Sequence, residues 1–232
     1  MNDIKLFSPL EEWLNRRTNL SSFIQIDDIQ ADFDIGGFLI LNNVIPIYEA
    51  IDLEAESLNI SWQKTNEYLE KAFDIINEEY PQKISLDKEE SRMIIDELDN
   101  PPKIMHPIYM MTIEKDGKEE VVYIGQTSSS KSRFKGGHSA ISKLHLPKFD
   151  GFSKKLYQCG ILLLNEDSEL VPLEWIKPLK TAKELLNSIE AQLIFHFQPE
   201  LNTLLKKNNK TTKYIQLHLQ NINNFFMHDT FV

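Results

Sequence analysis

The sequence predicts an α+β protein in which a small mixed sheet is flanked by helices. Short runs rich in β-branched and aromatic residues, at 108–113, 121–124 and 156–164, have the composition of strands. Two longer segments, 61–79 and 181–197, instead repeat apolar residues every three or four positions, which is the spacing of an amphipathic helix. Strand-like and helical segments in one chain of 232 residues indicate the α+β class.

Charge divides the chain near residue 100. Residues 1–100 hold 8 Lys/Arg and 22 Asp/Glu, a net charge of −14, whereas residues 101–213 hold 17 and 12, a net charge of +5. A polyanion is repelled by the first segment and attracted by the second, because phosphate contacts need Lys and Arg. With Asn100-Pro101-Pro102 as the boundary, we expect an acidic, mainly helical domain over 1–100, a second domain over 101–207 and a tail over 208–232.

Helices dominate the prediction for the acidic half. Ser8-Pro9-Leu10-Glu11 and Asp87-Lys88-Glu89-Glu90 have the pattern of capping boxes, so we expect a helix from Ser8 to about Asn19 and another from residue 88. The amphipathic helix 61–79 should end at Pro81. Phe38–Pro46 is apolar and fits either a strand or a buried turn. The acidic clusters of this half lack the spacing of a calcium loop, which favours a charged surface.

A β-hairpin opens the second half. Asp116-Gly117 stands between the runs 108–113 and 121–124, and both residues tolerate the positive φ that a two-residue hairpin turn requires. Each strand carries one tyrosine, Tyr109 and Tyr123. Pairing of the two strands would let both phenols project from one small sheet.

Helices and strands alternate after the hairpin. We expect a helix at Ser130–His145 that glycines interrupt, then strands at Leu156–Leu164 and Leu170–Ile176. Thr181-Ala182-Lys183-Glu184 has the pattern of a capping box and should begin a closing helix that Pro199 ends. The apolar stripe of that helix consists of Leu186, Ile189, Leu193 and Phe197, with Glu190 at its edge.

Four short motifs in this half resemble those of the GIY-YIG nuclease family. Pro107-Ile108-Tyr109 and Tyr123-Ile124-Gly125, with Arg133 ten residues after Tyr123, resemble its two signature elements and their arginine. Ile189–Ile194 and Gln198–Asn202 look like its glutamate helix and its closing P-x-L-N. The resemblance spans about residues 104–205, and Pro107 departs from it where the family's first glycine usually stands.

The resemblance implies a GIY-YIG-like sheet and a divalent-metal-dependent DNA endonuclease that hydrolyses phosphodiester bonds. It assigns Glu190 to Mg²⁺ or Mn²⁺ and Arg133 to the charge that builds on phosphorus. Tyr109 is the preferred base, with Tyr123 orienting water or backbone, and the reverse assignment stays open. For His138 three roles stay open: protonating the leaving oxygen, polarising a tyrosine, or contacting a phosphate. The implied catalytic residues are thus Tyr109, Tyr123, Arg133, His138 and Glu190, supported by Gly125 and Asn202.

Double-stranded DNA is the expected partner, and restriction or another form of anti-phage defence is the expected use. The expected nucleic-acid contacts are Lys131, Lys135, Lys143, Lys154 and Lys155. A repair or mobile-element nuclease, a catalytically silent nucleic-acid-binding module and a helical interaction protein remain as alternatives. The acidic half is also a candidate surface for a protein partner.

The tail is apolar enough to need a cover. Ile215, Leu219, Ile222 and Phe226 lie on one helical stripe, while Ile215, Leu217 and Leu219 equally fit strand alternation. We expect it to pack on the nuclease core or on a second copy of the chain in a homodimer.

Composition narrows the cellular context. Cys159 is the only cysteine, which excludes an intrachain disulfide and a cysteine-based metal cluster, and we expect it to be buried in a strand. The sequence has no run of about eighteen apolar residues and no signal-peptide pattern at its N-terminus. We therefore expect a cytoplasmic protein that does not enter the membrane.

Overall fold

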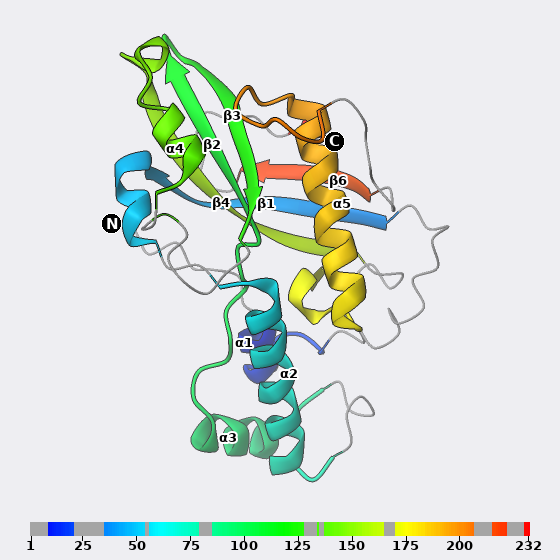
Figure 1. Ribbon diagram of the computed structural model, residues 1–232. Coiled ribbons are helices and arrows are strands. Elements are labelled where there is room, and N and C mark those ends of the chain that lie inside the picture. Colours follow the sequence, from blue (N-terminus) through cyan, green and yellow to red (C-terminus); the bar gives the residue numbers. More distant parts are fainter. Residues whose placement is uncertain are drawn as a thin grey trace.

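The computed structural model has a curled mixed sheet flanked by helices, which confirms the α+β prediction (Figure 1). It describes residues 9–20, 35–53, 56–78, 85–127, 134, 137–164, 170–206, 215–221 and 230–232. Its helices are α1 (Pro9–Leu14), η2 (Ile47–Asp52), α2 (Leu58–Ile75), α3 (Lys88–Glu97), α4 (Ser139–Lys143), η3 (Pro147–Phe149), η4 (Leu173–Trp175) and α5 (Leu179–Phe197). Its strands are β1 (Ile35–Pro46), β2 (Ile108–Lys115), β3 (Lys118–Gln126), β4 (Ser153–Leu164), β5 (Leu170–Pro172), β6 (Ile215–Asn221) and β7 (Thr230–Phe231).

The sheet is mainly antiparallel. Its strand order is β3-β2-β4-β1-β6-β7, and β5 pairs with β4. Only the pairing of β1 with β6 is parallel among these described strands. The β2–β3 hairpin therefore lies at one end of the sheet, with β3 as the edge strand, so β3 depends on other groups to satisfy its outer backbone atoms.

The predicted hairpin is confirmed. Asp116 and Gly117 have φ values of 53° and 74°, and two consecutive positive φ angles are those of a type I′ turn. The strands extend up to the turn on both sides, since Lys115 pairs with Lys118.

β1 joins the acidic half of the sequence to the sheet. It lies between β4 and β6, and Leu39 and Leu41 on it are buried. Of the two alternatives for this apolar segment, the strand is therefore correct. β1 precedes the expected boundary at residue 100, as do α1, α2 and α3. Its backbone hydrogen bonds, however, are with β4 and β6, which both follow that boundary.

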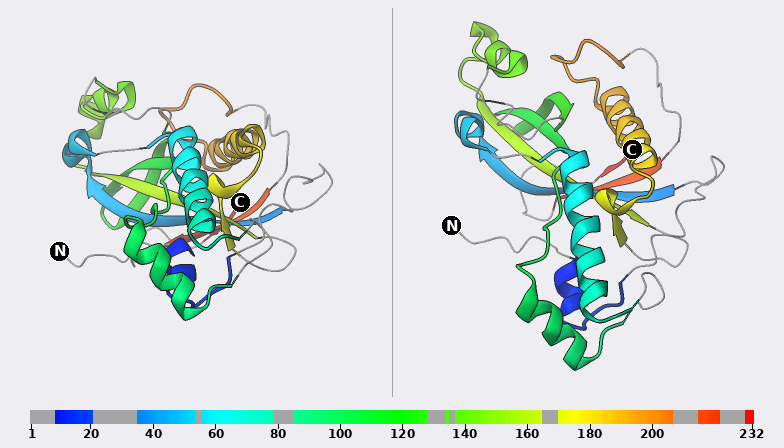
Figure 2. Two further views of the ribbon diagram at one scale, coloured as in Figure 1. Left: turned by 90° about the horizontal axis from the view of Figure 1, so that it is seen from below. Right: turned by 60° about the horizontal axis from the view of Figure 1, so that its bottom comes forward.

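Two apolar cores pack on the sheet. The larger contains residues of α1, α2, β1, α5 and β6. Figure 2 shows α2 and α5 close together over the middle of the sheet, and the two helices are in contact. The smaller core lies under α4 and η2, and it includes Tyr109, Met111, Ala140 and Leu144. The two cores place α4 and α5 on different parts of the hairpin.

The sequence predicted the start of α3 correctly, but it did not predict the start of α5 or the end of α1. Asp87 caps α3 in a complete capping box, since its carboxylate accepts the Glu90 N–H at 2.9 Å and the Glu90 carboxylate accepts the Asp87 N–H at 2.7 Å. The predicted capping box at Thr181 is wrong, because α5 already begins at Leu179 with Pro178 as its N-cap. α1 ends at Leu14, five residues before the predicted end at Asn19, and Arg16 adopts a φ of 57° that a helix cannot contain.

Two further segments are shorter or differently built than expected. The described helix within the predicted 130–145 is α4, Ser139–Lys143, and residues 128–133 and 135–136 lie outside the described part of the chain. The predicted strand 170–176 consists of the three residues of β5 followed by the 3₁₀ turn η4. Cys159 is buried on β4, as predicted, and burial raises the pKa of its thiol.

The tail forms a strand. Ile215, Leu217 and Leu219 of β6 are buried, and the Gln192 side chain on α5 donates to the Ile215 carbonyl at 2.8 Å and accepts the Ile215 N–H at 3.2 Å. Strand alternation is thus the correct alternative for residues 215–221, and they pack on the core of the same chain. No helix in the described ranges is long and apolar enough to cross a bilayer.

A buried carboxyl group holds the segment that leads into β2. Glu174 on η4 is 2% exposed, and its Oε1 accepts the Met105 N–H at 2.9 Å, whereas its Oε2 makes no hydrogen bond. Burial raises the pKa of Glu174 to about 7, from 4.5. Folding therefore disfavours the ionised form of Glu174. The protein loses stability as the pH rises from the pKa of Glu174 in the unfolded chain through its pKa in the folded protein.

We predict that Glu174→Gln removes this pH dependence. The quantity to compare is the free energy of unfolding of the wild type minus that of the variant. This difference should be lower at about pH 8 than at about pH 4.5, by about 3 kcal/mol. Urea unfolding at both pH values measures the difference, and groups common to both proteins cancel. A difference that is constant with pH would show that Glu174 does not titrate in this range.

Candidate active site

The hairpin brings Tyr109 and Tyr123 to one face of the sheet. Tyr109 on β2 is the register partner of Gly125, and Tyr123 on β3 is the partner of Met111. Tyr109 and Met111 are two residues apart, and directly opposed residues share a face, so both phenols lie on the same side. Their ring centroids are 6.0 Å apart with an interplanar angle of 29°.

Gly125 makes this arrangement possible. A Cβ atom at this position would lie 2.5 Å from the Tyr109 hydroxyl oxygen and 2.9 Å from Cε1 of Tyr123. Both distances are far below van der Waals contact, so any larger residue would displace the two rings. The glycine of the Tyr123-Ile124-Gly125 motif is thus required by the packing of the tyrosines.

His138 completes the cluster from the N-cap of α4. Its Nδ1 accepts the Ala140 N–H at 3.3 Å, and its Nε2 lies 3.0 Å from the Tyr109 hydroxyl. Because Nδ1 is an acceptor, the neutral ring carries its proton on Nε2 and donates it to the phenol oxygen. Such a donor stabilises the negative charge of that oxygen after it loses its proton.

The tyrosines differ in exposure. Tyr109 is 3% and His138 is 8% exposed, and Phe134 packs edge-on against Tyr109 with ring centroids 5.4 Å apart. Tyr123 is only partly buried. Accessibility to a substrate therefore favours Tyr123, whereas the hydrogen bond from His138 favours Tyr109 as the residue that handles a proton.

The segment after α5 supplies hydrogen bonds to the outer edge of β3. The Asn202 side chain accepts the Ile124 N–H and donates to the Ile124 carbonyl, both at 2.9 Å. The Leu201 N–H donates to the Val122 carbonyl at 2.9 Å. These contacts fix the strand that carries Tyr123 and Gly125, and Asn202 bonds the residue between those two.

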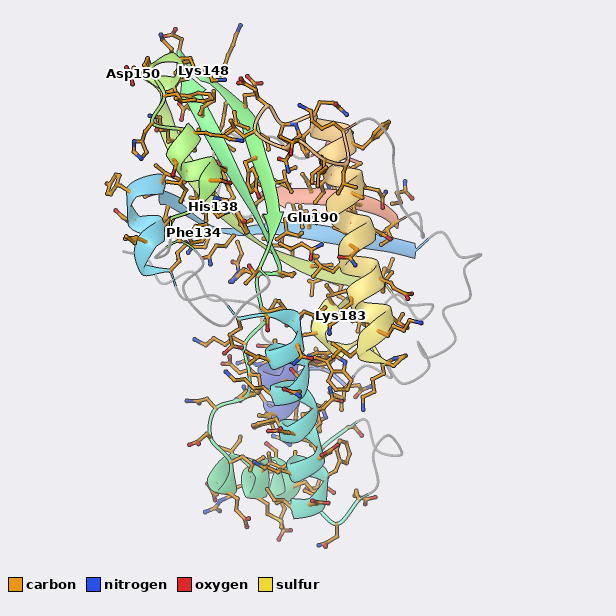
Figure 3. All side chains as sticks on the ribbon, in the orientation of Figure 1. Phe134, His138, Lys148, Asp150, Lys183 and Glu190 are labelled. Atoms are coloured by element: carbon orange, nitrogen blue, oxygen red, sulfur yellow. The ribbon has the colours of Figure 1, made fainter. Side chains whose placement is uncertain are left out.

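Glu190 lies on the other side of the hairpin from His138. Figure 3 places His138 on the α4 side and Glu190 on the α5 side. The Glu190 Oε2 accepts a hydrogen bond of 2.8 Å from the side chain of Gln126, the last residue of β3. The structure thus gathers Tyr109, Tyr123, Gly125 and His138 into one cluster and joins Glu190 to the same strand through Gln126.

The charge expected around the site is only partly described. Arg133, Lys131 and Lys135 lie outside the described residues. Lys143 is exposed at the end of α4, and Lys154 is half-buried on β4. Lys155 is ion-paired, with its Nζ 2.5 Å from a Glu114 oxygen and 3.7 Å from a Glu119 oxygen, so its charge is compensated within the chain.

Glu190 offers carboxylate oxygens, which are the ligands that a hard cation such as Mg²⁺ prefers. The described residues contain no group of three or more His, Cys, Asp and Glu that could hold a metal, which does not fit a closed zinc site. Mg²⁺ fits better, because it keeps several waters and binds proteins through one or two carboxylates together with substrate phosphates. Glu190 is the residue of this site that could hold such an ion.

A separate cavity of about 690 Å³ lies between α2 and the segment that leads into β2. Tyr68, His106 and Gln158 are among its lining residues, and burial raises the pKa of Tyr68 to about 12 and lowers that of His106 to about 4. The cavity wall is therefore neutral at these two side chains near pH 7. Gln158 is the register partner of Tyr109 on β4, so the cavity reaches the strand beside the tyrosine cluster.

Two residues of the site were not predicted from the sequence. Phe134 packs against both Tyr109 and His138, and Gln126 bonds Glu190. For Gln126 a signal was present, since it follows Gly125 directly and strand alternation places it on the face opposite the tyrosines. No protein-family profile, characterised protein or solved structure matches this chain.

We predict that Gly125→Ala destabilises the protein by about 1–3 kcal/mol, the range for overpacking a well-packed core. Gly36→Ala is the matched control, because its Cβ would meet only Leu164 atoms at 3.7 Å and 3.8 Å. Urea unfolding of the two variants tests the difference. Equal stability would mean that the tyrosine rings move aside without cost.

Proposed function

We propose that this chain is a divalent-metal-dependent endonuclease of the GIY-YIG type that hydrolyses phosphodiester bonds in DNA. The observation that carries the proposal is the hydrogen bond between His138 and Tyr109, inside a cluster that only a glycine at position 125 permits. A structural tyrosine would need neither a histidine in one fixed tautomer nor a second tyrosine beside it. The sequence motifs that resemble this family supply both tyrosines and the glutamate of the site, and His138 lies outside those motifs.

In the proposed reaction, Tyr109 accepts the proton of the attacking water. The Nε2–H of His138 stabilises the phenolate form that Tyr109 must have before it can accept this proton, and Tyr123, which is more exposed, orients the water. An unperturbed tyrosine has a pKa of about 10, so this assistance is needed near neutral pH. The P–O bond to the leaving oxygen breaks as the new P–O bond forms, and the leaving oxygen takes up a proton from solvent water.

Charge stabilisation falls to Glu190 and the basic residues. Glu190 would hold Mg²⁺ or Mn²⁺, which in such sites stabilises the charge on the transferring phosphate. By resemblance Arg133 adds a planar fork of donors for the same charge. Lys143, at the exposed end of α4, would contact the DNA backbone near the cluster. We propose restriction or another form of anti-phage defence as the use of this activity.

We predict that the purified protein cleaves DNA with Mg²⁺ or Mn²⁺ and not with chelator. Incubation with plasmid, phage and modified DNA measures this and identifies the substrate class. Glu190→Ala should lower cleavage by several orders of magnitude, because a metal supplies several kcal/mol and each ~1.4 kcal/mol is a factor of about ten. The control is Glu184→Ala, which removes another carboxylate from α5 and should cleave normally. Cleavage by Glu190→Ala at the wild-type rate would contradict the proposal.

The roles of the two tyrosines are separated by Tyr109→Phe and Tyr123→Phe. Each change removes one hydroxyl and almost no volume, so the free energy of unfolding should change little. Single-turnover cleavage should be slowed more by Tyr109→Phe, by about 10²–10⁴-fold, the usual contribution of general acid–base catalysis. A larger loss with Tyr123→Phe would reverse the two assignments, and normal rates in both would remove the tyrosines from the reaction.

A further inference from the structure

Gln126 connects the tyrosine-bearing strand to the glutamate of α5. It is the last residue of β3, and its Nε2 donates to Glu190 Oε2 at 2.8 Å and to Asn187 Oδ1 at 3.0 Å. Asn187 and Glu190 are three residues apart on α5, so they lie on the same side of the helix. One amide group therefore bridges two side chains of the helix from the strand.

The orientation of this amide is fixed by its partners. The Nε2 group has two N–H bonds, and two oxygens lie within hydrogen-bonding distance of it. Rotation of the amide by 180° would place its carbonyl oxygen against the Glu190 carboxylate, which accepts hydrogen bonds and donates none when ionised. Gln126 thus holds the Glu190 carboxylate through a donor that has one stable orientation.

A neutral donor suits a carboxylate that must bind a cation. A lysine or arginine at this position would hold Glu190 equally well, but it would also cancel its charge and compete with the metal. An amide restricts the carboxylate and leaves its negative charge in place. Carboxylates that bind metals are commonly held in this way, and loss of the holding group typically costs 10–100-fold in metal affinity or activity.

We propose that Gln126, fixed by Asn187, is a positioning residue that orients the Glu190 carboxylate for a divalent cation. The proposal rests on the function proposed above, and it adds a residue that the sequence motifs do not include. Because Gln126 directly follows Gly125, the same strand that packs the tyrosines also sets the glutamate. A shift of β3 would then move both parts of the site together.

The proposal is tested by binding of Mn²⁺ to the full chain without DNA. Paramagnetic Mn²⁺ broadens the NMR signals of nearby groups even when it binds weakly, so the side-chain amide signals of Gln126 and Asn187 should broaden at low Mn²⁺. Glu190→Ala should abolish this selective broadening. In Gln126→Leu, about 10–100-fold more Mn²⁺ should be needed to broaden the Asn187 signal.

Two variants control for general damage. Gln158→Leu makes the same change at a strand glutamine of β4 that bonds Asn43 and not Glu190, and it should respond to Mn²⁺ as the wild type does. Asn187→Ala changes an exposed helix position, so it removes one partner of the Gln126 amide without altering the sheet. The Mn²⁺ concentration needed to broaden the Gln126 signal should rise in this variant. The rise should be smaller than that of the Asn187 signal in Gln126→Leu. Asn187→Ala also keeps the test open if Gln126→Leu unfolds.

The outcomes separate this inference from the proposed function. If Glu190→Ala loses the broadening while Gln126→Leu and Asn187→Ala both respond as the wild type does, the positioning role is wrong and the metal site stands. If the wild type and Glu190→Ala respond alike, Glu190 does not bind the metal. In that case the positioning role and the metal-dependent mechanism are both wrong.

Discussion

The site depends on hydrogen bonds along the outer edge of β3. An edge strand leaves a row of N–H and C=O groups without strand partners, and buried groups of this kind must be satisfied. Here Leu201 and Asn202 bond Val122 and Ile124, and the side chain of Gln126 reaches α5. These contacts attach the closing helix and the segment after it to the hairpin. The relative positions of Glu190 and the tyrosines follow from this attachment.

The second constraint is the close approach of two aromatic rings to the backbone of β3. Gly125 lets the Tyr109 ring lie against the strand, and this places its hydroxyl 3.0 Å from Nε2 of His138. His138 in turn is held by its position as the N-cap of α4, where Nδ1 accepts a backbone N–H. The cap therefore has two consequences, since it begins the helix and selects the tautomer that faces Tyr109. Fold and proposed chemistry use the same hydrogen bond.

Local signals in the sequence predicted the parts of the fold that depend on neighbouring residues. Asp116-Gly117 specified the hairpin turn, and Asp87 with Glu90 specified the start of α3, because the groups that interact are within three residues of one another. The capping pattern at Thr181 failed because an earlier start at Leu179 places the same residues inside the first turn. For the tail both periodicities were present, and only the pairing of β6 with β1 selects the strand.

The pairing of strands that lie far apart in the chain could not be predicted from the sequence. β1 lies in the middle of the sheet because Leu39 pairs with Ile161 and Leu219, residues more than 100 positions away, and no pattern within β1 specifies those partners. The role of Gln126 was missed for a similar reason, since its partners on α5 become neighbours only when the helix docks on β3. The tyrosines and Glu190 could be selected from motifs that resemble a known family, with His138 as a further candidate outside those motifs. The hydrogen bonds of these residues, their exposure and the side of the hairpin on which each lies required the structure.

In the proposed mechanism, the tyrosine cluster and Glu190 act on one phosphodiester from the two sides of the hairpin. The most direct measurement is a crystal structure of the protein with Mn²⁺ and thymidine 3′,5′-bisphosphate, recorded at the manganese absorption edge. We expect an anomalous peak at the Glu190 carboxylate, with a phosphate oxygen of the nucleotide on the metal and the same phosphate facing the Tyr109 and Tyr123 hydroxyls. A manganese peak away from Glu190, or a phosphate bound where neither tyrosine can reach it, would contradict this mechanism.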